Sequence, residues 1–140
     1  MNTGKYVMGS LVVFVYIFLA EFVFHGVIMQ SFYTPHLHLL RPEAEMSAYM
    51  VWMTLGYLVQ AFGFCFIFVK GYERKGIAEG FRYGLYIALA FAWPTALVDY
   101  AVFPYPGSWI IGWMTGYPIM MIIAGMIFAA IYKPKTAPAV

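Results

Sequence analysis

The stretch that decides the fold is YVMGSLVVFVYIFLAEFVFHGVIMQ, residues 6–30. Apart from Glu21 and His25, it contains no side chain that is charged near neutral pH. About 20 apolar residues in a helix suffice to cross the ~30 Å hydrocarbon core of a bilayer. The stretch therefore predicts a transmembrane helix, and its acid and imidazole need a separate explanation.

The whole chain has the same apolar character. Hydrophobic residues make up 64% of its 140 residues and charged residues only 10%, and the mean hydropathy is +0.78. Soluble domains carry about 25% charged residues, so the composition excludes a soluble domain. The net charge of +2 is too small to indicate nucleic-acid binding, and the single cysteine, Cys65, allows no intrachain disulfide.

Four apolar runs predict four spans, at residues 6–30, 49–69, 83–103 and 109–132. Backbone groups in lipid must be paired, so spans are helices or barrel strands. Barrel strands alternate in hydropathy over ~10 residues, and these runs are far too continuous for that. We expect an all-α membrane protein, a single four-helix transmembrane bundle over residues 1–140.

The basic residues predict the direction of the spans. Seven of the eight lie before span one, between spans two and three, or after span four: Lys5, Lys70, Arg74, Lys75, Arg82, Lys133 and Lys135. Only Arg41 lies in the other links. Since cytoplasmic segments are rich in Lys and Arg, both termini are expected to be cytoplasmic. The link KGYERKGIAEGFR (70–82) mixes charges and predicts a solvated turn.

The two halves of the chain resemble each other. YIFLAEF (16–22) is echoed by YIALAFA (86–92), and WMTLGY (52–57) by WMTGY (113–117). Both halves would begin on the same side of the membrane. The pattern predicts a tandem duplication of a helical hairpin, related by a pseudo-axis along the membrane normal.

Small residues recur at every fourth position from the second link through span three: Gly76, Gly80, Gly84, Ala88, Ala92 and Ala96. Small residues at this period allow two helix backbones to approach closely in a membrane. The stripe is the expected contact face of span three. Its partner could be another helix of this chain or a second copy.

A second group of residues within the spans is polar: Glu21, His25, Gln60, Thr95 and Asp99. Glu21 and His25 are four positions apart and so share a helix face. A carboxylate in lipid costs several kcal/mol unless it is paired, protonated or hydrated. We expect this cluster to face the interior of the bundle.

Four interpretations of the cluster stay open. Its side chains could form interhelical hydrogen bonds, line a path for protons or a substrate, or hold a metal. The metal site would combine Glu21 and His25 with His36 and His38 of the loop. The fourth interpretation is a haem or quinone site, for which one histidine within the spans is too few in a single chain.

Catalytic signatures are missing from the chain, which has no P-loop, HExxH, CxxC or GxSxG motif. We therefore expect no enzyme, and we assign no cofactor. An enzyme acting on lipid or quinone at the outer interface, near Tyr33, His36 and His38, is the weakest alternative.

Three segments carry a resemblance to known proteins: AEFVFHG (20–26), KGYERKGIAEGFRYGLYIAL (70–89) and the closing IYKP (131–134). Together they resemble a group of small bacterial four-helix membrane proteins of unknown function. The resemblance implies a four-span fold in a bacterial inner membrane. It assigns no role to any residue.

Two functions fit these observations. The first is an accessory subunit in a larger membrane assembly, such as one of energy or electron-transfer metabolism. The chain has little mass outside its spans, and the small-residue stripe is longer than one crossing needs. The second is a small homodimeric transporter or ion-binding protein that uses Glu21, His25 and Asp99. Its partners would be the bilayer and either other subunits or a second copy.

Overall fold

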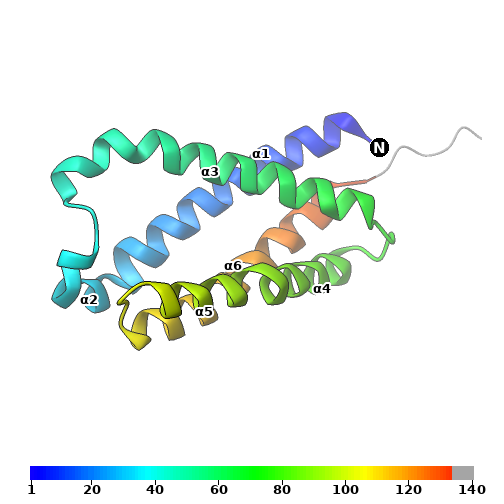
Figure 1. Ribbon diagram of the computed structural model, residues 1–140. Helices are drawn as coiled ribbons and strands as arrows, with labels where there is room; N and C mark the ends of the chain where they lie inside the picture. The colour runs from blue at the N-terminus through cyan, green and yellow to red at the C-terminus, as the bar shows by residue number, and fades with distance from the viewer. Residues whose placement is uncertain (134–140) are drawn as a thin grey trace, which may run out of the picture.

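The computed structural model describes residues 1–133, which form helices and turns without any strand. Four long helices lie roughly along one direction (Figure 1). The first is α1 (Thr3–Val23), extended by a π-helical turn (Phe24–Ile28), and the second is α3 (Glu43–Lys70). The third comprises α4 (Ile77–Ile87), a π-helical turn (Ala88–Ala92) and α5 (Trp93–Val102), and the fourth is α6 (Gly107–Ile131). A short helix α2 (Gln30–Tyr33) and a 3-10 turn (Thr34–Leu39) lie in the first loop.

All four long helices are long and apolar enough to cross a membrane. The expectation of an all-helical chain with four long apolar helices is therefore confirmed. Two helices begin before the predicted spans that they contain: α3 begins at Glu43, ahead of residue 49, and the third helix begins at Ile77, ahead of residue 83. Hydropathy locates only the apolar part of a helix, and both of these helices start with a polar turn. The first turn of α3 contains Glu43 and Glu45, and the first turn of α4 contains Glu79.

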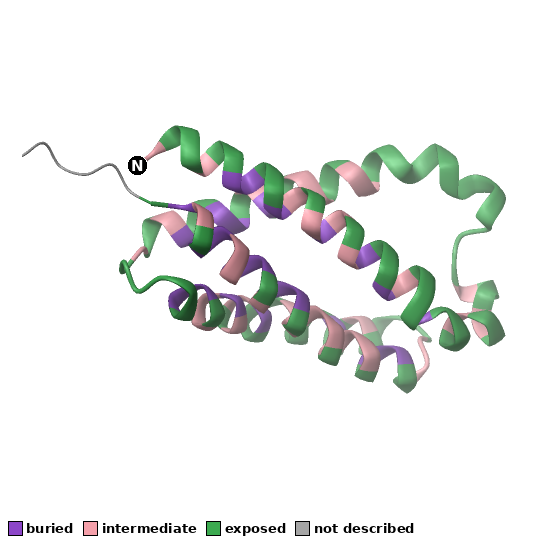
Figure 2. Ribbon diagram, turned by 180° about the vertical axis from the view of Figure 1, so that it is seen from behind, coloured by how far each residue is buried: buried purple, intermediate pink, exposed green. Residues whose placement is uncertain are grey.

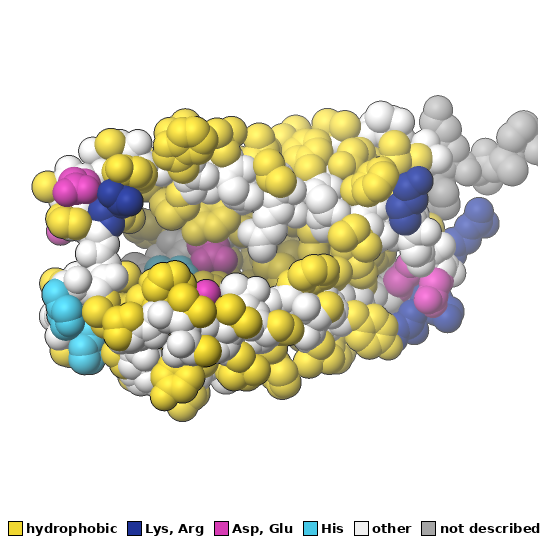
Figure 3. Space-filling view, viewed as in Figure 1, with side chains coloured by type: hydrophobic (Ala, Val, Ile, Leu, Met, Phe, Trp, Pro, Cys, Tyr) yellow, Lys and Arg dark blue, Asp and Glu magenta, His cyan; other side chains and the backbone are white. Residues whose placement is uncertain are grey.

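Both ends of the described chain lie at one end of the bundle. The backbone N–H of Asn2 donates to the Tyr132 hydroxyl at 3.3 Å, and the Asn2 side chain donates to the Lys133 carbonyl at 3.1 Å. The turn between α3 and α4 lies at this same end, because the Tyr72 hydroxyl donates to the Tyr132 carbonyl. We call this the terminal end and the opposite one the loop end. Lys and Arg gather at the terminal end, and one basic residue, Arg41, lies at the loop end (Figure 3); Lys135 lies outside the described residues.

The helices pack unevenly. Helix α6 packs against α4 and α1, and α3 packs against α1. Most of the hydrophobic core lies toward the terminal end, where Phe68 of α3 meets Phe128 of α6 and Phe64 meets Tyr83 of α4. Figure 2 shows the consequence: the half of α3 near the loop end is almost entirely exposed, and it stands apart from α5 in Figure 1.

The turn between α3 and α4 is held by a buried carboxylate. Glu79 accepts hydrogen bonds from the backbone N–H groups of Glu73 at 2.6 Å and Lys75 at 2.8 Å. Lys75 and Arg82 both contact the Glu73 carboxylate and lower its pKa, with Lys75 the larger cause. The prediction that residues 70–82 form a solvated turn is wrong for Glu79. This residue already belongs to α4, and its buried carboxylate binds the backbone of the turn.

The small-residue stripe lies against α6 of the same chain. A methyl group on Gly84 would overlap the Met121 carbonyl, and one on Gly80 would overlap the carbonyl of Gly125. This close contact between the two helix backbones stabilises their packing, and a larger residue at either glycine would prevent it. The residues Ala88 and Ala96 farther along the stripe are buried, and Ala92 is half-buried.

Gly76 does not belong to this contact, so its inclusion in the stripe is wrong. A methyl group on it would meet nothing within 4 Å. Its φ of +66° lies in the left-handed region, which glycine adopts without the steric cost of a Cβ. Gly76 therefore shapes the turn before α4.

We predict that Gly84→Ala separates α4 from α6 and lowers the stability of the purified protein. Forcing a methyl group into a packed contact costs roughly 1–3 kcal/mol. The matched control is Gly63→Ala, since a Cβ there meets nothing within 4 Å and alanine favours a helix over glycine by up to about 1 kcal/mol. Thermal melting in detergent checks this, and equal melting temperatures for the two variants would contradict the contact.

Candidate functional site

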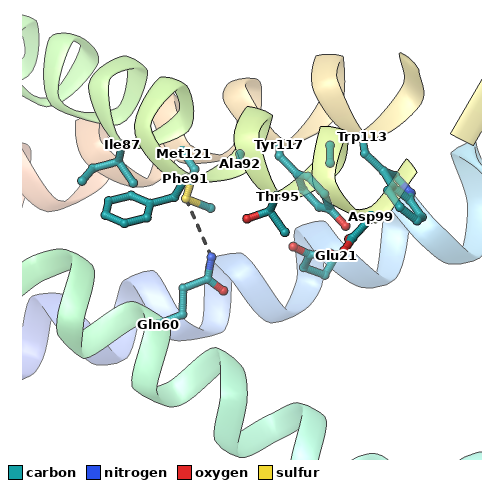
Figure 4. Close-up of a pocket in the computed structure, with 11 residues that line it drawn as sticks. Glu21, Gln60, Ile87, Phe91, Ala92, Thr95, Asp99, Trp113, Tyr117 and Met121 are labelled. Carbon is teal, nitrogen blue, oxygen red and sulfur yellow. Dashed lines mark hydrogen bonds between the residues drawn. The ribbon is translucent and has the colours of Figure 1, made fainter. Parts of the chain in front are cut away.

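The predicted polar cluster lines a cavity of about 400 Å³ in the half of the bundle near the loop end. Glu21 of α1, Gln60 of α3 and both Thr95 and Asp99 of α5 all face it (Figure 4). The other lining residues are apolar or aromatic: Ile87, Phe91, Ala92, Ala96, Trp113, Tyr117 and Met121. The structure therefore brings together four of the five predicted residues. Gln60 contacts Met121 across the cavity, with 3.9 Å between Nε2 and Sδ.

His25, the fifth predicted residue, lines a second cavity of about 470 Å³ between α1, α3 and the first loop. Three methionines of α3 form much of its wall: Met46, Met50 and Met53. Glu21 and Trp113 line both cavities. The Glu21 side chain thus lies where the two chambers meet. Figure 3 shows acidic side chains at the floor of a hollow in this half of the molecule.

Two local features create this arrangement. The loop-end half of α3 stands away from α5 and leaves the space between them unfilled by protein. The π-helical turn Phe24–Ile28 extends α1, with the Met29 N–H donating to the Phe24 carbonyl at 2.8 Å. Such π-helical insertions often occur at functional sites. Glu21 precedes this turn and His25 belongs to it.

A chain of hydrogen bonds joins three helices to Glu21. Trp113 Nε1 donates to the Tyr33 hydroxyl at 2.9 Å, and that hydroxyl lies 2.5 Å from His25 Nδ1. His25 Nε2 lies 3.1 Å from Glu21 Oε2 and 3.1 Å from the Tyr117 hydroxyl. Tyr33 also stacks on the His25 ring with an interplanar angle of 13°. These contacts hold the imidazole in one orientation.

One tautomer of His25 gives the Tyr33 hydroxyl proton an acceptor. An indole N–H can only donate, so the Tyr33 oxygen accepts from Trp113, and an unprotonated His25 Nδ1 is the acceptor within reach of the hydroxyl proton. Burial raises the pKa of Tyr33 above its ordinary value, so its hydroxyl keeps this proton. The imidazole is then neutral and carries its proton on Nε2, from which it donates to Glu21. This assignment follows from the network, as hydrogens must be inferred.

The charge balance of the site is unusual. Glu21 is only 7% exposed, and the neutral imidazole gives it a hydrogen bond but no countercharge. Asp99 adds a second carboxylate to the same cavity. Among the described residues, no Lys or Arg lines either cavity. The two carboxylates in mainly apolar walls therefore have no Lys or Arg partner in this part of the chain.

The four metal-site candidates are not brought together. His36 and His38 lie in the first loop with ring centroids 6.2 Å apart, and His36 packs against Trp109 rather than His25. Among residues 1–133, no three His, Cys, Asp or Glu side chains gather closely enough to hold a metal ion. The structure therefore does not support a metal site built from Glu21, His25, His36 and His38.

Three further residues line a cavity together with Glu21 and are not among the predicted site residues: Tyr57, Trp113 and Tyr117. Tyr57 and Tyr117 are the last residues of the two similar segments WMTLGY and WMTGY, and each lines one of the cavities beside Glu21. This repeat was the sequence signal that could have identified them. Tyr33 was noted only as an interfacial residue, because its partner Trp113 is distant in the chain.

Comparisons with other proteins add no assignment: the chain matches no protein-family model, no curated protein and no solved structure. The function must therefore be argued from the geometry of the cavities.

We predict that Tyr33→Phe removes the proton donor to His25 Nδ1 and redistributes the imidazole proton between the two ring nitrogens. The ¹⁵N chemical shifts of labelled histidine check this, in a His36→Asn, His38→Asn background that leaves His25 as the one histidine of the sequence. The background protein should show an unprotonated Nδ1 and a protonated Nε2. A doubly protonated imidazole at neutral pH would contradict the assignment.

Proposed function

We propose that the protein is a small membrane transporter that binds a cation at Glu21 in exchange for a proton. The observation that carries this proposal is a nearly buried carboxylate hydrogen-bonded to His25, whose other ring nitrogen faces the Tyr33 hydroxyl; we infer that this imidazole is neutral. An uncompensated charge in a low-dielectric site is expensive, by several kcal/mol even after relaxation. Glu21 is therefore neutralised either by a proton or by a bound cation.

Exchange between the protonated and the cation-bound form of Glu21 would couple cation transport to the proton gradient. A proton and a cation cannot neutralise the carboxylate at the same time, so cation binding releases a proton. Asp99 and Thr95 face the same cavity and supply further oxygens to the cation. The remaining residues of the network, Tyr33 and Trp113, keep His25 neutral, so that it does not take the place of the cation.

We further propose that both termini are cytoplasmic and that the membrane is a bacterial inner membrane. The concentration of Lys and Arg at the terminal end supports this direction, and the cavities would then lie toward the outer face. We also propose that the fold arose by duplication of a hairpin. The positions of Tyr57 and Tyr117, one from each half and both next to the site, support it.

An accessory subunit is the second candidate function, and one observation still favours it. Outside the four long helices, the described chain has only short segments, which leaves little to act alone. The length of the small-residue stripe no longer favours it, because α6 of the same chain covers Gly80 and Gly84. We propose no enzymatic activity.

The topology proposal predicts opposite labelling of two engineered cysteines. Arg41→Cys and Lys5→Cys, each in a Cys65→Ala background, place single thiols at exposed positions of the loop end and the terminal end. In intact cells an impermeant maleimide should label position 41 and reach position 5 only after permeabilisation. The reverse pattern would invert the topology.

The transport proposal predicts that Glu21→Gln abolishes cation–proton exchange. Proteoliposomes with an acidic interior and a trapped pH dye would be given sodium, potassium, magnesium, zinc or benzyltrimethylammonium outside. At least one of these should discharge the pH gradient with the wild-type protein and with the matched control Glu43→Gln, an exposed acid at the start of α3. If no cation discharges the gradient with the wild-type protein, the proposed function is wrong.

A further inference from the structure

We propose that the cation is an organic one, a substituted ammonium with an aromatic or alkyl body, and that it lies across both cavities. This inference rests on the proposed function and names its substrate class. The observation that supports it is the lining of the two cavities around the carboxylates. This lining is mainly aromatic rings and methionines, with few further oxygen or nitrogen atoms that could bind a metal.

The donor set around Glu21 is poor for a metal ion. Calcium takes 6–8 oxygen ligands and magnesium six, whereas the described cavity offers two carboxylates, two hydroxyls and one amide, from Glu21, Asp99, Thr95, Tyr117 and Gln60. The Tyr117 hydroxyl already contacts His25, and the amide nitrogen of Gln60 contacts Met121. The imidazole of His25 already has partners on both nitrogens.

The same walls suit an organic cation. Phe91, Trp113 and Tyr117 line the cavity that holds Glu21 and Asp99. The faces of aromatic rings attract ammonium groups, and aromatic surroundings are a known mode of recognising quaternary ammonium ligands. Carboxylates compensate the charge without having to coordinate it closely. The ammonium group would therefore lie between Glu21 and Asp99, against these rings.

The second cavity fits the apolar body. Its walls include the flexible side chains of Met46, Met50 and Met53, which adapt to ligands of different shape. Glu21 and Trp113 line both chambers, so one ligand can place its charge in the first and its body in the second. The volumes of about 400 and 470 Å³ lie in the range typical of sites for small organic molecules.

The chain offers a matched pair of tryptophans to test the aromatic contribution. Trp113 faces both cavities, whereas Trp52, at the start of the other copy of the repeat, is 68% exposed and lines neither. A general loss of aromatic surface would affect the two substitutions alike. A contact with the cation would affect only Trp113.

The test is calorimetric titration of the purified full chain in detergent with benzyltrimethylammonium, and with neopentylbenzene, its uncharged carbon analogue. We expect the cation to bind and the neutral analogue to bind at least about tenfold more weakly, a factor that corresponds to ~1.4 kcal/mol. Glu21→Gln should weaken cation binding at least tenfold. Trp113→Leu should weaken it several-fold, and Trp52→Leu should leave it unchanged. Asp99→Asn serves as a second charge variant, should Glu21→Gln fail to fold, and it should weaken binding too.

Each other outcome overturns the inference in a distinguishable way. Equal binding of cation and neutral analogue would show mere apolar partitioning. If sodium, potassium or a divalent metal discharges the pH gradient in a Glu21-dependent manner while benzyltrimethylammonium does not bind, the substrate class is wrong and the proposed function stands. If no cation binds and none discharges the pH gradient, the inferred substrate class and the proposed function are both wrong.

Discussion

A charge surrounded by hydrocarbon must be compensated, and the half of the bundle near the loop end is organised around that constraint at Glu21. Its hydrogen-bond partner is His25. Because Trp113 can only donate, the Tyr33 hydroxyl has its own proton available for a hydrogen bond to His25 Nδ1. In the proposed function the imidazole therefore stays neutral, and the charge that compensates the carboxylate comes from outside the chain.

The two halves of the bundle meet different requirements. Near the terminal end, α4 and α6 approach until Gly80 and Gly84 touch the backbone of the opposite helix. Glu79 fixes the turn beside them. Near the loop end, α3 leaves its neighbours and the cavities open. The closely packed half therefore holds the helices together, while the other half contains the two cavities.

Much of the fold could be predicted from the sequence, because apolar runs of this length have one stable arrangement in lipid. The polar cluster was predictable for the same reason, since Glu21 and Asp99 are costly anywhere except facing other polar groups. The starts of α3 and α4 were not predictable from hydropathy, as their first turns are polar. Glu79 was missed because a buried acid within a mixed-charge link has the same local sequence as a solvated one.

The network around His25 could not be predicted, because it depends on contacts between distant parts of the chain. Tyr33 and Trp113 are 80 residues apart, and nothing in their local sequence pairs them. The role of Gly76 was misjudged for a related reason. Spacing alone does not distinguish a glycine that packs from one that turns the backbone.

The most direct test of the central claim is an infrared difference spectrum of the purified protein on adding a cation that it binds. The account predicts that the band of a protonated carboxyl group disappears, that a carboxylate band appears, and that both changes are absent from Glu21→Gln. A Glu21 that is ionised with and without the cation, beside a positively charged His25, would contradict it. The pair would then be a closed ion pair that holds two turns of one helix together.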